Sequence, residues 1–172
     1  KIFEEEFAKY HSSKFCIMVN SGSSANQLAI SSLFFRKEGI NLKTDDEVIV
    51  PAVSWSTTYS PLFYHGLRLR FVDIDLDTLN VDLDKLESSV TNNTKAIFSV
   101  NLLGNPNYFH RIKEIAKKNN LILLEDNCES LGAEFDNNKT GTFGDIGTCS
   151  GFFSHHISTM EGGMILTDDE EI

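Results

Sequence analysis

Apolar residues along the chain follow two alternating spacings. Short, nearly continuous apolar runs are typical of buried strands, whereas apolar residues three and four positions apart are typical of helices that cover a sheet. The runs predict strands at 15–19, 46–51, 68–74, 95–101, 121–126, 146–151 and 162–168. The helical spacing predicts helices at 1–11, 23–35, 55–65, 82–90 and 108–119. This alternation predicts an α/β domain with a mostly parallel sheet sandwiched by helices.

The regular spacing is lost after the strand that ends at residue 126. The stretch 136–145, DNNKTGTFGD, is rich in Asn, Gly and Asp, which favour turns. We find no internal repeat, low-complexity tract or linker composition along the chain. Residues 1–172 are therefore expected to form one unit.

Polar residues gather where the predicted strands end. Ligands of open parallel sheets bind outside the carboxyl ends of the strands. These ends carry the segments 20–24, 51–55, 101–105, 125–129 and 150–156. We expect a ligand site to be built from these five segments.

Composition narrows the classes of function. The chain has 25 acidic and 15 basic residues, which give a formal net charge of −10. Binding to nucleic acid requires a basic surface that faces the phosphate backbone, so this balance argues against it. The hydrophobic share of 41% is that of a soluble globular domain with a sizeable core. Small-molecule chemistry is favoured.

Cysteine usage and the absence of a targeting segment indicate a cytoplasmic protein. Cys16, Cys128 and Cys149 form no CxxC pair, so neither a disulfide framework nor a zinc knuckle is expected. The uncharged run 16–35 is too polar at its centre to span a membrane. The chain begins without Met, in the acidic helical pattern of 1–11, which resembles the middle of a larger chain and not a signal peptide.

The stretch NSGSSAN, residues 20–26, suits a turn that leads into a helix. Gly22 permits a tight turn, and Ser23 and Ser24 open a helix whose free N–H groups and positive dipole end attract a phosphate. An ordinary serine cap is the alternative, because such caps are common.

Two residues that follow predicted strands directly are candidates for contact with a planar ligand. Asp126 ends the run 121–126, and an ionised carboxylate there can hold a proton on a heteroaromatic nitrogen. A helix cap or loop Asp is the alternative. Trp55 is the only tryptophan, and its ring could stack on a cofactor, although a lone Trp is more often a large core residue.

Adjacent histidines, His155 and His156, lie in the stretch GFFSHHISTMEGG, residues 151–163. A metal site needs further ligands at suitable spacing, and adjacent side chains do not readily converge on one ion. No metal site is expected, and a structural histidine is the simpler interpretation of the pair taken alone.

Taken in order, six motifs resemble the DegT/DnrJ/EryC1/StrS sugar-nucleotide aminotransferase family, whose members are fold type I pyridoxal-phosphate enzymes. The motifs are NSGSSANQLAI, DEVIVPAVSWSTT, NLLGNP, LEDNCESLGA, GTFGDIGTCS and EGGMILT. The resemblance covers essentially the whole chain. It implies that residues 1–172 are the cofactor-binding large domain, truncated at both ends, and that the small C-terminal domain is absent.

Site residues follow from the resemblance position by position. It implies that Ser23, Ser24 and Ser150 bind the phosphate of the cofactor. It also implies that Trp55 stacks on the cofactor ring and that Asp126 pairs with the pyridinium nitrogen.

Two positions depart from the pattern of the aminotransferases. Glu129 would lie beside the cofactor ring, where those relatives usually carry Gln. The family lysine that bonds covalently to the cofactor follows the phosphate-binding serine by five residues and precedes the second glycine by eight. Counted from Ser150 and from Gly163, both spacings reach His155. This replacement resembles a branch of sugar-nucleotide 3-dehydratases, lyases that serve dideoxysugar, lipopolysaccharide and O-antigen biosynthesis.

Histidine in place of lysine changes the expected chemistry. An imidazole forms no comparable stable bond with the cofactor aldehyde, so pyridoxal phosphate or pyridoxamine phosphate is expected to be held non-covalently. Histidine exchanges protons near neutral pH, so His155 is suited to take a proton from the cofactor and to assist departure of the carbon-3 hydroxyl. His156 is assigned no catalytic role.

The resemblance also implies partners. It implies a nucleotide-sugar substrate, glutamate as amino donor, a homodimer, and no nucleic acid or membrane. Two alternatives remain open. One is the iron–sulfur branch of the 3-dehydratases, for which Cys128 is a candidate. The other is a catalytically silent homologue that binds cofactor or nucleotide sugar without turnover.

Overall fold

A computed structural model describes the whole chain, residues 1–172. The helices are α1 (Ile2–His11), α2 (Gly22–Ser32), α3 (Ser56–Tyr64), α4 (Leu83–Ser89), η1 (Leu102–Gly104, a 3-10 turn) and α5 (Phe109–Asn119). The strands are β1 (Phe15–Val19), β2 (Glu47–Pro51), β3 (Arg68–Val72), β4 (Thr94–Val100), β5 (Ile122–Asp126), β6 (Glu134–Phe135), β7 (Asn138–Lys139), β8 (Ile146–Ser150) and β9 (Gly163–Thr167). Every predicted helix and strand is confirmed, with its ends shifted by about three residues or fewer. The small hairpin β6–β7 was not predicted.

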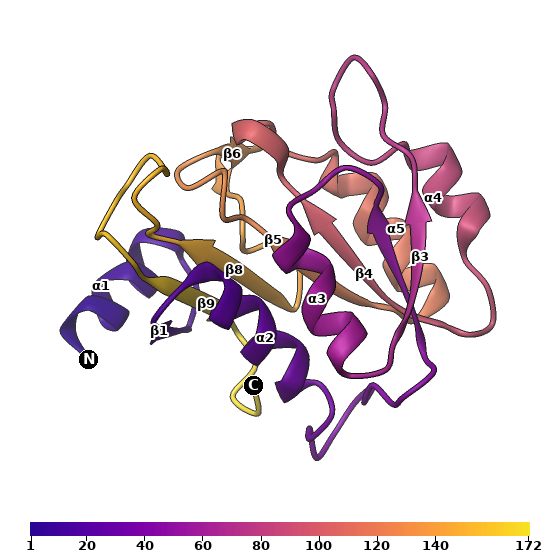
Figure 1. Cartoon of the computed structure of the whole chain (residues 1–172), viewed down its shortest axis with the longest axis horizontal. Coiled ribbons are helices and arrows are strands. Elements are labelled where there is room, and N and C mark those ends of the chain that lie inside the picture. The colour runs from indigo at the N-terminus through magenta and orange to yellow at the C-terminus, as the bar shows by residue number, and fades with distance from the viewer.

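The main sheet has seven strands in the order β1-β9-β8-β5-β4-β2-β3 (Figure 1). Strand β2 pairs in parallel with β3 and β4, β4 with β5, and β5 with β8. Only β9 runs antiparallel to its neighbours, β1 and β8. The mostly parallel sheet is therefore confirmed, and the carboxyl ends of β1, β2, β5 and β8 lie at one edge.

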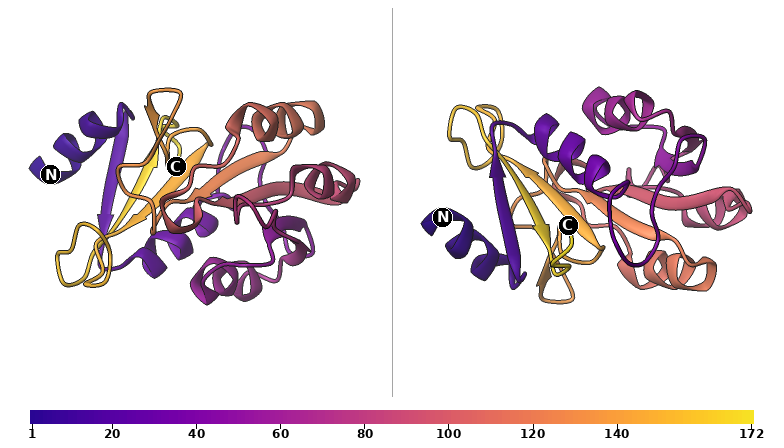
Figure 2. Two further views of the ribbon diagram at one scale, coloured as in Figure 1. Left: turned by 90° about the horizontal axis from the view of Figure 1, so that it is seen from above. Right: turned by 90° about the horizontal axis from the view of Figure 1, so that it is seen from below.

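Helices cover both faces of the sheet. Helices α2 and α3 lie on one face, and α1, α4 and α5 lie on the other (Figure 2). Successive residues of a strand point to opposite faces. Val48 and Val50 accordingly belong to the core under α2 and α3, whereas Ile49 belongs to the core under α4 and α5. This burial on both faces is why the strands read as continuous apolar runs.

The loop 151–162 joins β8 to β9 at the edge that carries the polar strand ends. The N–H of Gly151 donates to the carbonyl of Gly162 at 2.9 Å, and the N–H of Thr159 donates to the carbonyl of Gly151 at 2.9 Å. These bonds close the loop at its base and hold residues 152–158 out from the sheet. No helix in the structure is both long enough and apolar enough to cross a bilayer.

Candidate active site

A cavity of about 380 Å³ lies at the carboxyl edge of the sheet. Twelve of its 15 lining residues come from four of the five segments that the sequence singled out. They are Ser21, Gly22 and Ser23 after β1, Ser54 and Trp55 after β2, Asp126, Cys128 and Glu129 at the end of β5, and Ser150, Phe152, Ser154 and His155 after β8. Thr57, Val100 and Glu161 complete the lining from outside these segments. A cavity therefore lies at the edge where the sequence predicts a ligand site, and ligand binding there stays a prediction.

The segment 101–105 does not contribute, which corrects the fifth part of that prediction. Asn101 is fully buried, and its side-chain oxygen accepts from the N–H of Asn107 at 3.1 Å. Its amide group donates to the side-chain oxygen of Asn127 at 3.2 Å. Asn101 is therefore satisfied inside the fold, and only Val100 of this strand reaches the cavity.

The first turn of α2 borders the cavity with free backbone donors. The Ser21 hydroxyl caps the helix by accepting from the N–H of Ser24 at 3.1 Å. The first N–H groups of a helix have no partner within it, so those of Gly22 and Ser23 stay available to an anion. Ser23 and Ser150 both line the cavity beside them.

Ser24, unlike Ser23 and Ser150, does not line the cavity. Its hydroxyl accepts from that of Ser21 at 3.1 Å. Ser21 thus forms an ordinary serine cap, while its neighbours Gly22 and Ser23 line the cavity. A phosphate contact by Ser24 stays a prediction.

Gly22 lies too close to neighbouring side chains for any residue larger than glycine. A Cβ added to it would lie 2.6 Å from the Cβ of Ser150 and 2.9 Å from the Sγ of Cys128. The start of α2, the end of β8 and the turn after β5 therefore meet with no space left for a methyl group. Burial raises the pKa of the Cys128 thiol well above its ordinary value, with the Asp126 carboxylate adding to the shift.

Asp126 is held by three donors. Its Oδ2 accepts from Asn26 Nδ2 at 2.9 Å and from the Thr58 hydroxyl at 2.7 Å. Its Oδ1 accepts from the N–H of Cys128 at 3.1 Å. The residue is 5% exposed and lines the cavity, and its carboxylate accepts three hydrogen bonds within the fold.

The neighbouring carboxylate, Glu125, points away from the cavity. It accepts from the N–H groups of Gly141, Phe143 and Gly144 at 2.8, 2.5 and 2.7 Å. Burial raises its pKa, and the N–H donors oppose that shift. Glu125 therefore organises the turn before β8, and Asp126 alone of the pair is available to a ligand.

Trp55 is not a core residue, so that alternative is wrong. The residue stands at the N-terminus of α3 and is 69% exposed while lining the cavity. Leaving an indole this exposed forgoes the hydrophobic stabilisation of burial. The ring is placed where a planar ligand could cover it.

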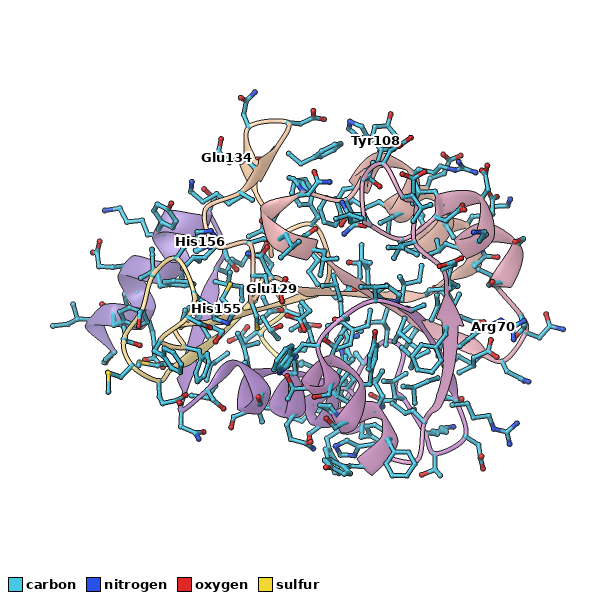
Figure 3. The ribbon with its side chains drawn as sticks, turned by 45° about the horizontal axis from the view of Figure 1, so that its top comes forward. Arg70, Tyr108, Glu129, Glu134, His155 and His156 are labelled. Atoms are coloured by element: carbon cyan, nitrogen blue, oxygen red, sulfur yellow. The ribbon has the colours of Figure 1, made fainter.

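The two histidines differ in their surroundings. His155 lines the cavity and is half-buried, whereas His156 is exposed and does not line it. The N–H of His155 donates to the carbonyl of Phe152 at 2.9 Å, and the two rings meet edge to face with centroids 6.0 Å apart. Figure 3 labels both histidines on the β8–β9 loop and, near them, Glu129, a residue of the cavity lining.

Glu129 is tied to the segment that follows β4. Its carboxylate accepts from the N–H of Leu103 at 3.3 Å and lines the cavity. A second carboxylate, that of Glu161, also reaches the lining. No lysine lines the cavity. No group of three or more His, Cys, Asp and Glu side chains in the structure could hold a metal ion.

Sequence reasoning missed the residues that surround Asp126. Asn26 lies within the helix of the NSGSSAN motif, and Thr58 lies within the hydroxyl-rich run SWSTT. Both are buried polar residues, which is uncommon unless they are hydrogen-bonded. The only signal in the sequence was a cluster of hydroxyl and amide side chains next to two strand ends.

The strand order and the cavity at the carboxyl edge of the sheet are those of a large domain of the aminotransferase type. The family model of the DegT/DnrJ/EryC1/StrS aminotransferases matches residues 1–172, and the chain belongs to this family. Over 172 residues it is 60% identical to GDP-4-keto-6-deoxy-D-mannose 3-dehydratase of Escherichia coli O55:H7. That match covers 100% of this chain and 44% of the relative. The chain thus spans less than half the length of this relative.

Solved structures agree with the fold. The E. coli GDP-4-keto-6-deoxy-D-mannose-3-dehydratase with bound hydrated PLP superposes with a TM-score of 0.95 at 60% identity, covering 98% of this chain and 43% of that one. A GDP-4-keto-6-deoxymannose-3-dehydratase with a trapped PLP-glutamate geminal diamine gives a TM-score of 0.95 at 59% identity, covering 98% and 44%. The large-domain assignment of the fold is confirmed.

Proposed function

We propose that this chain is the cofactor-binding part of a sugar-nucleotide 3-dehydratase that acts on GDP-4-keto-6-deoxymannose. The observation that carries the proposal is the position of His155 in a cavity that holds Asp126 and Ser150 and no lysine. The 60% identity to the E. coli 3-dehydratase supports the same substrate.

The residues of the cavity fit pyridoxal phosphate or pyridoxamine phosphate held without a covalent bond. The N–H groups of Gly22 and Ser23 and the hydroxyl of Ser150 suit the phosphate, at a place where a Cβ on Gly22 would remove the space. Asp126 suits the ring nitrogen, and Trp55 suits the ring face. A relative of this chain binds PLP.

The bound amine form of the cofactor supplies an amino group for the keto carbon of the sugar and an electron sink for the bond that breaks. His155 would take a proton from the carbon next to the cofactor ring and return it to the departing carbon-3 hydroxyl, which leaves as water. Asp126 would keep the ring nitrogen protonated. Because no lysine lines the cavity to complete transamination, the cycle would end in a 3-deoxy sugar and ammonia.

Other partners are part of the proposal. Glutamate would regenerate the amine form, which the PLP-glutamate adduct of a relative supports. The whole protein would act as a homodimer. The iron–sulfur alternative rests in this chain on Cys128, which is partly exposed and lines the cavity next to Gly22.

The test uses the full-length protein with pyridoxamine phosphate and GDP-4-keto-6-deoxymannose. A 3-deoxy product and ammonia are expected, and His155→Asn should retain the cofactor while slowing turnover by about a hundredfold or more. His156→Asn is the matched control and should react as the unchanged protein does. Cofactor binding without product would contradict the proposal and show a silent homologue.

A further inference from the structure

The carboxylate of Asp126 has four acceptor positions, and the fold fills three of them. A carboxylate offers about four lone-pair sites, two on each oxygen. Asn26 and Thr58 occupy both sites of Oδ2, and the N–H of Cys128 occupies one site of Oδ1. One acceptor site remains, and it belongs to Oδ1.

The direction of each bond is fixed by further partners. The Thr58 hydroxyl has one hydrogen and gives it to Asp126, so in the 2.8 Å contact with Ser54 the Ser54 hydroxyl must donate. The amide of Asn26 is oriented in the same way. Its Oδ1 accepts from the Thr148 hydroxyl at 2.6 Å, so its Nδ2 must face Asp126.

These contacts join three separate elements of the fold. Asn26 comes from α2, Thr58 from α3 and Thr148 from β8, and all three side chains are at most 1% exposed. A buried network in which every member is satisfied holds its groups in one arrangement. The carboxylate cannot rotate without leaving a buried donor unpaired, which is costly.

We propose that Asn26 and Thr58 are positioning residues that lock the Asp126 carboxylate, so that Oδ1 alone accepts the proton-bearing ring nitrogen of the cofactor. This inference rests on the proposed function, because it requires pyridoxal phosphate in the cavity. Asn26 and Thr58 do not line the cavity, yet through Asp126 they would control the protonation state of the cofactor ring.

The decisive variant is Thr58→Val, which removes the hydroxyl and keeps the shape of the side chain. In the full-length protein we expect pyridoxal phosphate to bind about tenfold more weakly, because a hydrogen bond to a charged group is lost. The chemical shift of a ¹⁵N-labelled ring nitrogen should move toward that of unprotonated pyridine. Thr58→Ser keeps the hydroxyl and should restore both values.

Ser60→Ala is the matched control, because Ser60 lies on the same helix and its hydroxyl bonds only to the Ser56 carbonyl. Ser54→Ala removes the hydrogen bond to Thr58 together with one hydroxyl of the cavity lining, and it should give a smaller shift of the same sign. If the unchanged protein does not bind pyridoxal phosphate, the proposed function fails and the inference fails with it. If it binds and Thr58→Val matches Ser60→Ala in the nitrogen shift, the positioning role is wrong while the function stands.

Discussion

Gly163 at the start of β9 lies directly against the backbone carbonyl of Ser21 at the start of α2. A Cβ added to Gly163 would be 2.0 Å from that oxygen and 2.8 Å from the backbone nitrogen of Gly22. Strand β9, which follows the loop 151–162, and the turn at the start of α2 are therefore packed backbone to backbone. A shift in one moves the other.

Gly163→Ala should consequently damage both stability and cofactor binding. The added methyl group meets rigid backbone, so we expect a loss of about 2–3 kcal/mol in the free energy of unfolding. Pyridoxal-phosphate affinity should fall with it. Chemical denaturation and a fluorescence titration of the full-length protein measure the two effects.

Gly162→Ala is the matched control for this prediction. Its Cβ would lie 2.8 Å from the hydroxyl of Thr159 and 4.0 Å from the end of the Met18 side chain, and both side chains can move. Its effect on unfolding should be clearly smaller. Equal losses from the two variants would show that the contact with Ser21 is not the cause.

Exchange of the histidines should separate their roles. Because His155 occupies the cavity, His155→Lys should attach pyridoxal phosphate covalently, with a borohydride-reducible bond and a shifted absorbance band. His156→Lys places the same amine outside the cavity lining and should give no such bond. A stable adduct with the second variant alone would place the wrong histidine in the site.

Trp55 should matter for binding and not for folding. With a side chain 69% exposed, Trp55→Ala should change the free energy of unfolding by about 0.5 kcal/mol or less. Loss of ring stacking should weaken pyridoxal-phosphate binding by about threefold to tenfold, and Trp55→Phe should recover part of it. Phe63→Ala, on the same helix and 73% exposed, should alter neither quantity.

The cysteines should be unreactive in the folded protein. Burial raises the pKa of Cys16 and of Cys149 to about 12, and it raises that of Cys128 as well. A raised pKa keeps the thiol protonated, so at pH 8 only about one Cys149 in ten thousand carries the reactive thiolate. Iodoacetamide should label the native protein slowly and the denatured protein fully. Rapid native labelling at pH 8 would contradict these shifts.

Element order and the edge that carries the site could be predicted because they depend on local pattern. The strands are buried on both faces, so their apolar runs stand out, and each run leads into residues at the carboxyl edge. Asp126 was predicted from its place at a strand end. A strand-end position alone does not distinguish an Asp that faces a ligand from one that caps a helix or stabilises a loop. In the structure the buried donors Asn26 and Thr58 hold the Asp126 carboxylate at the cavity.

What the sequence could not show depends on contacts between distant segments. The support of Asp126 joins residues 100 positions apart for Asn26 and 68 apart for Thr58. Asn101 looked like a ligand residue because it follows a strand, yet its amide serves the turn at Asn107. No local pattern distinguishes a strand-end amide that faces a cavity from one that faces its own chain.

The closed base of the loop 151–162 bears on how such enzymes diverge. The loop is anchored through Gly151, Thr159 and Gly162, whereas the side chain at position 155 makes no hydrogen bond and meets the Phe152 ring edge to face. This side chain can therefore be exchanged without rebuilding the scaffold. A substitution at position 155 alone could change the reaction that the site catalyses, while the free energy of unfolding stays nearly the same.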